Sequence, residues 1–224
     1  MAALEFEVVT PIEAIKAFKD RVPMSPAEFA ALLAEEKNVA FSVANTTSAD
    51  MVNDIYTEID KAIKDGIPLK EFKAGIDEVF DRRGWTKLNP WHLDTVFRQN
   101  TQVAYNTGRF EQMNEAGEEA FPLWRFSVID DPETTDICLQ LLGGVYPAND
   151  PIFDRYYPPN HFNCRTEVVP ISKFKKTKVH KNKLKIIPPE EWDKNPAKRD
   201  FAPDTTKYPQ PLRGAVDKEL KKWR

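Results

Sequence analysis

The stretch LWRFSVI at residues 123–129 alternates large apolar side chains with polar ones. Trp124 and Phe126 fall on one face of an extended chain and Arg125 and Ser127 on the other, because successive side chains of a strand point to opposite faces. This alternation predicts a half-buried strand. The residues before it repeat at helical spacing, so the stretch marks a change of structure along the chain. The predicted fold class is therefore α+β.

Upstream of this strand, apolar residues recur at helical spacing in five segments. We expect these helices to begin at Pro11, Ser25, Ser48, Pro68 and Asn89, which are residues that favour helix starts. Gly66 and Gly84 supply C-terminal stops. Because the connections are short, the helices are expected to pack as a bundle-like lobe over residues 1–120.

Downstream of the strand, the pattern predicts a small mixed lobe over residues 121–172. An acidic turn at 130–135 leads into a short helix around Cys138, and two further strands are expected, the first at Val145 and Tyr146 and the second over 165–169. The loop that joins these two strands is long for a structureless connection. We therefore expect it to be functional or fixed to the body.

The charge is divided unevenly along the chain. Residues 1–172 carry 16 basic and 28 acidic side chains, whereas residues 173–224 carry 16 basic and 7 acidic ones. The second segment is expected to form an extended, proline-rich basic arm with a short helix over 214–223. Its first part contains seven lysines and no acid: Lys173, Lys175, Lys176, Lys178, Lys181, Lys183 and Lys185.

Composition places the chain among soluble globular proteins, with 41% hydrophobic and 30% charged residues. No apolar run reaches the roughly 18 residues of a membrane span, and no membrane partner is expected. The N-terminal residues lack the basic start and apolar core of a signal peptide, which predicts synthesis in the cytosol. In that compartment Cys138 and Cys164 would be free thiols or metal ligands.

Residues 130–165, DDPETTDICLQLLGGVYPANDPIFDRYYPPNHFNCR, resemble the core motif of the phage Mu F-like head morphogenesis proteins, the minor head proteins of tailed phages. Other segments are similar to the same family in the same order. Upstream these are residues 10–23, 41–66 and 97–109, and downstream 190–198 and 201–209.

The resemblance implies a structural virion component rather than an enzyme, acting at or near the portal vertex in head morphogenesis. It further implies a role in DNA packaging or ejection, and a location in the phage head interior after assembly in the host cytoplasm. The partners it implies are the portal protein and the major capsid protein.

This chain departs from the family pattern at three positions. Cys138 stands where relatives usually have histidine, Thr166 replaces a cysteine after Asn163, Cys164 and Arg165, and Ala197 replaces a glycine. The first two departures bear directly on whether a metal site exists here.

Cys138, His161 and Cys164 have the side chains that a structural zinc site uses, with Asp136 or Asp154 as a fourth ligand. The favoured interpretation is that the cysteines are small core residues and His161 a hydrogen-bonded loop histidine. No cofactor is therefore expected. A disulfide between the two cysteines is disfavoured by the reducing compartment.

The acidic turn allows two interpretations. Asp131 and Asp136 could work with His161 in a small metal-dependent enzyme, a nuclease or transferase built on residues 130–165. We favour helix capping, because no catalytic spacing accompanies the carboxylates. Three arginines, Arg98, Arg109 and Arg165, are expected to converge on this turn and join the two lobes through ion pairs.

For the lysine segment 173–185 we rank docking to a protein first. The surface would belong to the portal protein or to a neighbouring copy of the chain. Apolar residues between the lysines, including Phe174 and Leu184, suit a protein surface better than water. Nonspecific binding of packaged DNA ranks second.

Overall fold

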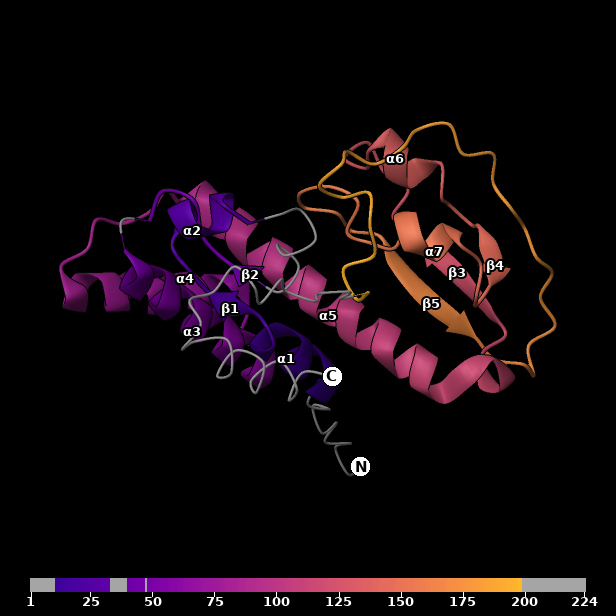
Figure 1. Ribbon diagram of the computed structural model, residues 1–224, viewed down its shortest axis with the longest axis horizontal. Helices are drawn as coiled ribbons and strands as arrows, with labels where there is room; N and C mark the ends of the chain where they lie inside the picture. The colour runs from indigo at the N-terminus through magenta and orange to yellow at the C-terminus, as the bar shows by residue number, and fades with distance from the viewer. Residues whose placement is uncertain (1–10, 33–39, 47, 199–224) are drawn as a thin grey trace, which may run out of the picture.

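The computed structural model describes residues 11–32, 40–46 and 48–198. Two lobes lie side by side, and one long helix passes from the first into the second (Figure 1). The first lobe is helical and the second contains a small sheet with short helices, so the predicted α+β class is confirmed. The predicted helix at 214–223 lies outside the described residues.

Five helices of the first half begin where the sequence predicted. They are α1 (Ile12–Lys19), α2 (Pro26–Ala30), α3 (Ala49–Asp65), α4 (Leu69–Arg83) and α5 (Pro90–Ala120). Side chains of Ser25, Ser48 and Asn89 accept backbone N–H groups at the starts of α2, α3 and α5. Gly66 and Gly84 adopt left-handed backbone angles at the ends of α3 and α4, which glycine does without steric cost.

The first core is made of apolar residues from α1, α3, α4 and the first half of α5, together with Phe41 and Val43. Its largest fully buried side chains are Phe18, Phe41, Ile55, Ile59, Ile63, Phe72, Ile76 and Phe80. Trp85 packs against this core, whereas Trp91 is 70% exposed. A large aromatic side chain on a helix favours a core position, and that interpretation is wrong for Trp91. It lies two residues before the buried Leu93, on the opposite side of the helix.

A two-stranded parallel sheet in the helical lobe was not predicted. It pairs β1 (Val22–Pro23) with β2 (Ala40–Phe41), in the register Val22 with Ala40 and Pro23 with Phe41. Two residues are too few to show alternation, so the sequence pattern carries no signal for these strands.

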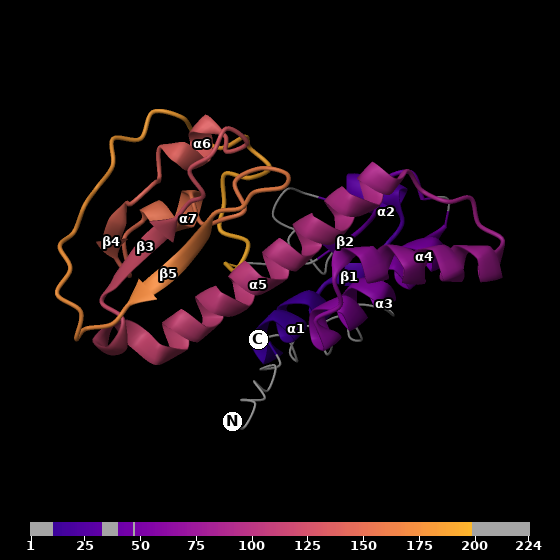
Figure 2. The same cartoon turned by 180° about the vertical axis from the view of Figure 1, so that it is seen from behind.

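Helix α5 belongs to both lobes (Figures 1 and 2). Its 31 residues span about 46 Å at 1.5 Å per residue. Leu93, Val96 and Ala104 enter the first core, whereas Phe110 and Met113 enter the second. Near its end the helix is interrupted at Gly117, where φ is +75°. The helix is thus the structural link between the lobes.

In the second lobe, three antiparallel strands form a sheet in the order β4, β3, β5. These strands are β3 (Leu123–Ser127), β4 (Val145–Pro147) and β5 (Glu167–Ile171). Trp124 and Phe126 are buried while Arg125 and Ser127 are exposed, which confirms the alternation predicted for the central strand. Two short helices complete the lobe, α6 (Asp136–Leu139) and α7 (Ile152–Arg155).

The long loop that was expected to be functional or fixed is fixed to the body. It contains α7, and Phe153, Tyr156 and Tyr157 are buried in the second core. Phe162 is 60% exposed, with its ring edge-on to Trp192 at 5.0 Å between centroids. Aromatic burial at about 1.5 to 3 kcal/mol per side chain stabilises the loop against the sheet.

Residues 173–198, which we call the strap, contain no helix or strand and run around the outer edge of the second lobe (Figure 1). One isolated bridge pairs His180 with Val145. Leu184 and Ala197 pack against the second core. This first part of the basic arm is therefore docked on its own chain.

Among the helices of the described segments, none combines the length and the apolar character needed to cross a membrane.

Candidate functional site

Three potential metal ligands from two separate segments meet in the second lobe. Cys138 comes from α6, and His161 and Cys164 come from the segment that leads into β5. The Cys138 Sγ lies 3.3 Å from His161 Nε2 and 3.7 Å from Cys164 Sγ. All three ligand atoms lie within 4.8 Å of one another. Both cysteines are buried and unbonded to each other, and His161 is half-buried.

Backbone contacts orient the imidazole of His161. Its Nδ1 lies 2.8 Å from the Phe162 carbonyl oxygen, which can only accept a hydrogen bond. Nδ1 therefore carries the proton, and in the neutral ring Nε2 has a free lone pair directed at Cys138. The Thr135 hydroxyl also approaches Nε2, at 2.9 Å.

The contacts within this cluster shift the pKa values of the two thiols in opposite directions. Hydrogen bonds from Cys164 and, when its ring is protonated on both nitrogens, from His161 stabilise the thiolate of Cys138 and lower its pKa. The pKa of Cys164 is raised, chiefly by its contact with Cys138 and by burial. The hydrogen bond to Cys138 also raises the pKa of His161. Cys138 is thus the thiol that ionises first.

Neither carboxylate considered as a fourth ligand joins the cluster. Within the described segments, the group of ligand atoms contains only the two thiols and the imidazole. Asp154 on α7 forms an ion pair with Lys198 of the strap, and Asp136 is exposed at the first position of α6. The suggested role of Asp136 or Asp154 as a ligand is therefore wrong.

An ion pair lies beside the cluster. Arg165 donates two hydrogen bonds to Asp131, at 2.8 and 2.5 Å, and a third to the Thr134 hydroxyl at 2.8 Å. The guanidinium lowers the pKa of Asp131 to about 2. Asp131 is thus held ionised in a bidentate pair, which removes it from the acid–base role that the enzyme interpretation required.

The other two arginines do not reach the acidic turn. Arg109 on α5 pairs with Glu167 on β5, at 2.6 Å, and so joins the long helix to the sheet. Arg98 is exposed and forms no ion pair with any residue in the described ranges. The expected convergence of all three arginines is therefore wrong, because Arg98 and Arg109 lie three turns apart on α5, about 16 Å along its axis, and meet different neighbours.

The lysine segment lies on the strap with its side chains largely in solvent. Lys181 pairs with Asp150 at 2.6 Å, and the Lys173 ammonium lies 5.5 Å from the Phe174 ring centre. Five lysines are exposed and form no ion pair with a described residue, namely Lys175, Lys176, Lys178, Lys183 and Lys185. Phe174 is 85% exposed between them, whereas Leu184 is packed against the second core.

Two amide side chains, which no sequence pattern marked, attach the strap to the second lobe. The Gln140 amide accepts the backbone N–H groups of Lys185 and Ile186 and donates to the Ile186 carbonyl. Asn182 donates to the carbonyls of Gln140 and Leu142. A long-range amide contact leaves no periodic trace in a sequence, so no pattern marked these residues.

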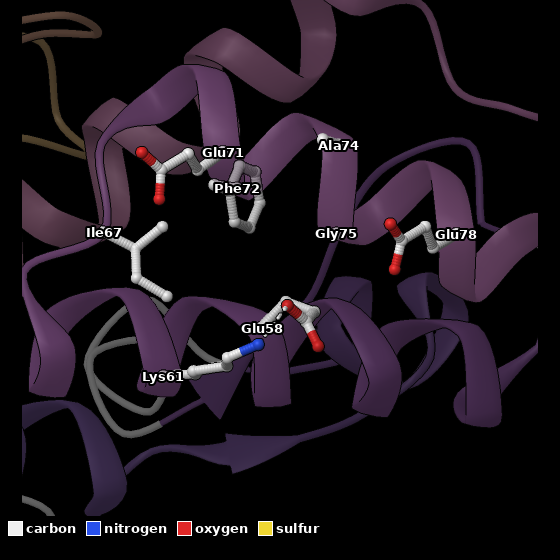
Figure 3. Close-up of a pocket in the computed structure, with 8 residues that line it drawn as sticks. All are labelled: Glu58, Lys61, Ile67, Glu71, Phe72, Ala74, Gly75 and Glu78. Atoms are coloured by element: carbon white, nitrogen blue, oxygen red, sulfur yellow. Dashed lines mark ion pairs between the residues drawn. The ribbon is translucent and has the colours of Figure 1, made fainter.

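A separate groove of about 270 Å³ lies between α3 and α4. Figure 3 shows Glu58 and Lys61 on α3 facing Glu71 and Glu78 of α4 across it. Lys61 is 3.9 Å from Glu58, and the other lining residues are two glutamates and the uncharged Ile67, Phe72, Ala74 and Gly75. It is remote in sequence from the Cys–His cluster and shares no residue with it.

The fold and the cluster define a two-lobed α+β protein whose second lobe encloses a buried Cys–His cluster beside an aspartate–arginine pair. The family described as Phage Mu protein F like protein matches residues 53–169, from α3 into β5. The chain belongs to this family.

Two curated relatives are similar to this chain. One is the "Mu-like prophage FluMu F protein" of Haemophilus influenzae, 31% identical over 147 residues, which is 60% of this chain and 35% of the relative. The other is the "Putative capsid assembly protein F" of Escherichia phage Mu, 28% identical over 156 residues, 62% of this chain and 35% of the relative. The chain thus spans about a third of the length of these relatives. No solved structure matches it.

Proposed function

We propose that this protein is a structural minor component of a tailed-phage head that acts in head assembly at or near the portal vertex. Its family membership supports the head assembly role, since one relative is named as a putative capsid assembly protein. The two relatives are longer proteins, so the role assigned here concerns the body that they share with this chain.

The observation that carries the proposed docking role is the exposed surface of the strap. Its backbone is attached to the second lobe, while Phe174 and five lysines that form no ion pair with a described residue extend into solvent. A rigid basic surface with an exposed aromatic ring suits an acidic protein partner, because charge gives orientation and the ring gives buried apolar area. The partner is the portal protein, the major capsid protein or a neighbouring copy.

Charge reversal on the strap tests the docking role. The double variant Lys175→Glu, Lys176→Glu reverses two exposed lysines of the strap, and Lys64→Glu, Lys70→Glu makes the same change in charge on the helical lobe. We expect the first variant to fall at least about tenfold in copies per head, counted by mass spectrometry of purified particles. Equal incorporation of both variants would contradict the docking role.

Deleting residues 173–224 is a less specific test. The deletion would remove Leu184 and Ala197 from the second core, so loss of incorporation could reflect loss of folding. Charge reversal leaves these core contacts in place.

DNA is the second candidate partner, and salt dependence distinguishes it. Phosphate neutralisation by lysines releases counterions, so affinity for DNA would fall steeply with added salt. The Lys175→Glu, Lys176→Glu variant should then lose affinity and show a shallower salt slope. A flat salt response with duplex DNA removes DNA binding and leaves the protein partner.

The enzyme alternative has less support from the geometry. A nuclease or transferase at residues 130–165 would need Asp131 and Asp136 free to act with His161, but Asp131 is held by Arg165 and Asp136 is absent from the ligand group. An assembled particle of a His161→Asn variant that delivers no DNA would favour the enzyme. If the His161→Asn variant instead fails to assemble into particles, the result favours the structural role.

A further inference from the structure

The Cys138 sulfur lies from the Cys164 sulfur and from the His161 Nε2 at distances close to those around one tetrahedral metal ion, and all three atoms lie within 4.8 Å of one another. Two thiolates bound at about 2.3 Å to one tetrahedral zinc lie about 3.8 Å apart, and a thiolate and an imidazole nitrogen lie about 3.6 Å apart. In this structure the corresponding distances are 3.7 Å for Cys138 and Cys164 and 3.3 Å for Cys138 and His161.

The surroundings of the cluster also suit a metal. The Phe162 carbonyl accepts a hydrogen bond from Nδ1 of His161, which leaves a lone pair on Nε2, 3.3 Å from Cys138 Sγ. Such a backbone partner on the remote ring nitrogen is the usual outer contact of a metal-binding histidine. The cluster borders a small cleft with room for about one water molecule, lined in part by Asn163 and Thr166.

We propose that Cys138, His161 and Cys164 bind one zinc ion, with a water molecule from the cleft as fourth ligand. The donor set selects the metal class, because thiolate and imidazole prefer zinc while magnesium and calcium prefer oxygen. Two thiolates and a neutral imidazole also cancel the charge of Zn²⁺, which suits a centre with two buried ligands. This inference does not depend on the proposed role in the phage head.

The zinc ion would act as a clamp. It would join α6 to the segment 161–164 and close a loop of the chain that contains β4 and α7. The adjacent Asp131–Arg165 pair joins the turn before α6 to the residue after this segment and would be held in the same arrangement. The cluster thus stabilises a part of the second lobe where regular secondary structure is sparse.

Metal analysis of the full chain tests this proposal. Protein purified under reducing conditions should carry one zinc per chain. Replacement by Co²⁺ should give the thiolate charge-transfer absorption and the intense visible bands of a tetrahedral site. His161→Asn should weaken zinc binding by more than about a hundredfold, because it removes a direct ligand rather than an outer contact. His180→Asn, an exposed histidine of the strap, is the matched control and should bind like the wild type.

Thiol protection gives a second readout that needs no variant. Zinc should protect Cys138 and Cys164 together from alkylation, and a chelator should expose both. Absence of zinc with no thiolate band for cobalt would overturn the proposal. So would full zinc binding by Cys138→Ser, or isolation of the two cysteines as a disulfide from a reducing cytosol.

Discussion

The two lobes differ in what holds them together. The core of the helical lobe is largely aliphatic. It comes mainly from helices, namely the first half of α5 and shorter helices of up to 17 residues. The core of the second lobe is mainly aromatic. Apart from the α5 residues Phe110 and Met113, it comes from strands and helices of three to five residues and the segments beside them. Its large members are Phe110, Trp124, Phe126, Tyr146, Phe153, Tyr156 and Tyr157.

This difference shows two routes to a stable lobe. In the helical lobe, backbone hydrogen bonds are satisfied locally, and apolar faces at helical spacing then pack. In the second lobe much of the chain has no such ladder, so large rings and side-chain bonds to the backbone replace it. Tyr157, for example, donates to the Asn106 carbonyl of α5, and Asn195 donates to the Phe153 carbonyl. The second lobe should therefore be more sensitive to single substitutions.

The largest effect is expected from Phe153→Ala. The Phe153 ring lies 5.0 Å from Trp124 and 5.4 Å from Phe126 between centroids, and it is 2% exposed. Removing it should cost about 3 to 5 kcal/mol of unfolding free energy, measured by urea denaturation. Hydrogen exchange should rise in β3 and β5 while α3 stays protected. Equal loss of protection in α3 would contradict the view that each lobe has its own core.

A pair of glycine variants tests the packing of the helical lobe. A Cβ at Gly108 on α5 would lie 2.6 Å from the Ala14 nitrogen, so Gly108→Ala forces α1 and α5 apart and should destabilise by about 1 to 3 kcal/mol. A Cβ at Gly75 on α4 would meet only the end of the Glu58 side chain.

Gly75→Ala is therefore the control, and it should stabilise by up to about 1 kcal/mol through helix propensity. Thermal unfolding of both variants measures the difference. The same sign of effect for both glycines would show that helix propensity, rather than close approach of α1 and α5, governs this lobe.

Gln140→Ala should release the strap. The variant removes three hydrogen bonds between the Gln140 amide and residues 185–186, each worth about 1 kcal/mol. We expect a loss of about 1 to 3 kcal/mol and faster hydrogen exchange at Lys185 and Ile186. Gln112→Ala, at an exposed position on α5, is a matched control that should leave the exchange unchanged. Unaltered exchange in Gln140→Ala would mean that the core contact of Leu184 alone attaches the strap.

The smallest loss of stability is expected from breaking the Asp131–Arg165 pair, and this loss depends on pH. The pKa of Asp131 is lowered from 3.8 to about 2 in the folded protein. Its contribution to stability is present above its unfolded pKa and is lost as the pH falls from about 4 to about 2. Asp131→Asn should reduce stability at neutral pH and flatten this part of the pH curve, measured by urea unfolding.

Glu133→Gln is the control for the pH effect, because Glu133 forms no ion pair with a described residue. It should retain the fall in stability seen in the wild type over this range. If Asp131→Asn and Glu133→Gln gave the same pH curve as the wild type, the pair would contribute nothing to the folding equilibrium.

The sequence predicted the regular elements well because their signals are local. A cap residue, a run of apolar side chains at helical spacing and a final glycine all lie within one segment, as in α3 from Ser48 to Gly66. The alternation of β3 is equally local. The two-residue strands β1 and β2 gave no such signal, and the exposure of Trp91 depends on which side of α5 the lobe covers.

For the candidate site, the sequence supplied the ligand types but not their arrangement. Cys138, His161 and Cys164 were recognisable as zinc-binding residue types, yet spacing could not show that α6 brings Cys138 within 3.7 Å of Cys164. Nor could it separate Arg165, which reaches Asp131, from Arg98, which does not.

The amino-acid sequence by itself determined the helices, the alternating central strand, the uneven charge and the resemblance to the Mu F-like family, because each is written in residues close together along the chain. Only the tertiary structure decided the Cys–His cluster, the docking of the strap through Gln140 and the sharing of α5 between two cores. These features join residues that are distant in sequence, and their geometry arises only when the chain folds and each core forms.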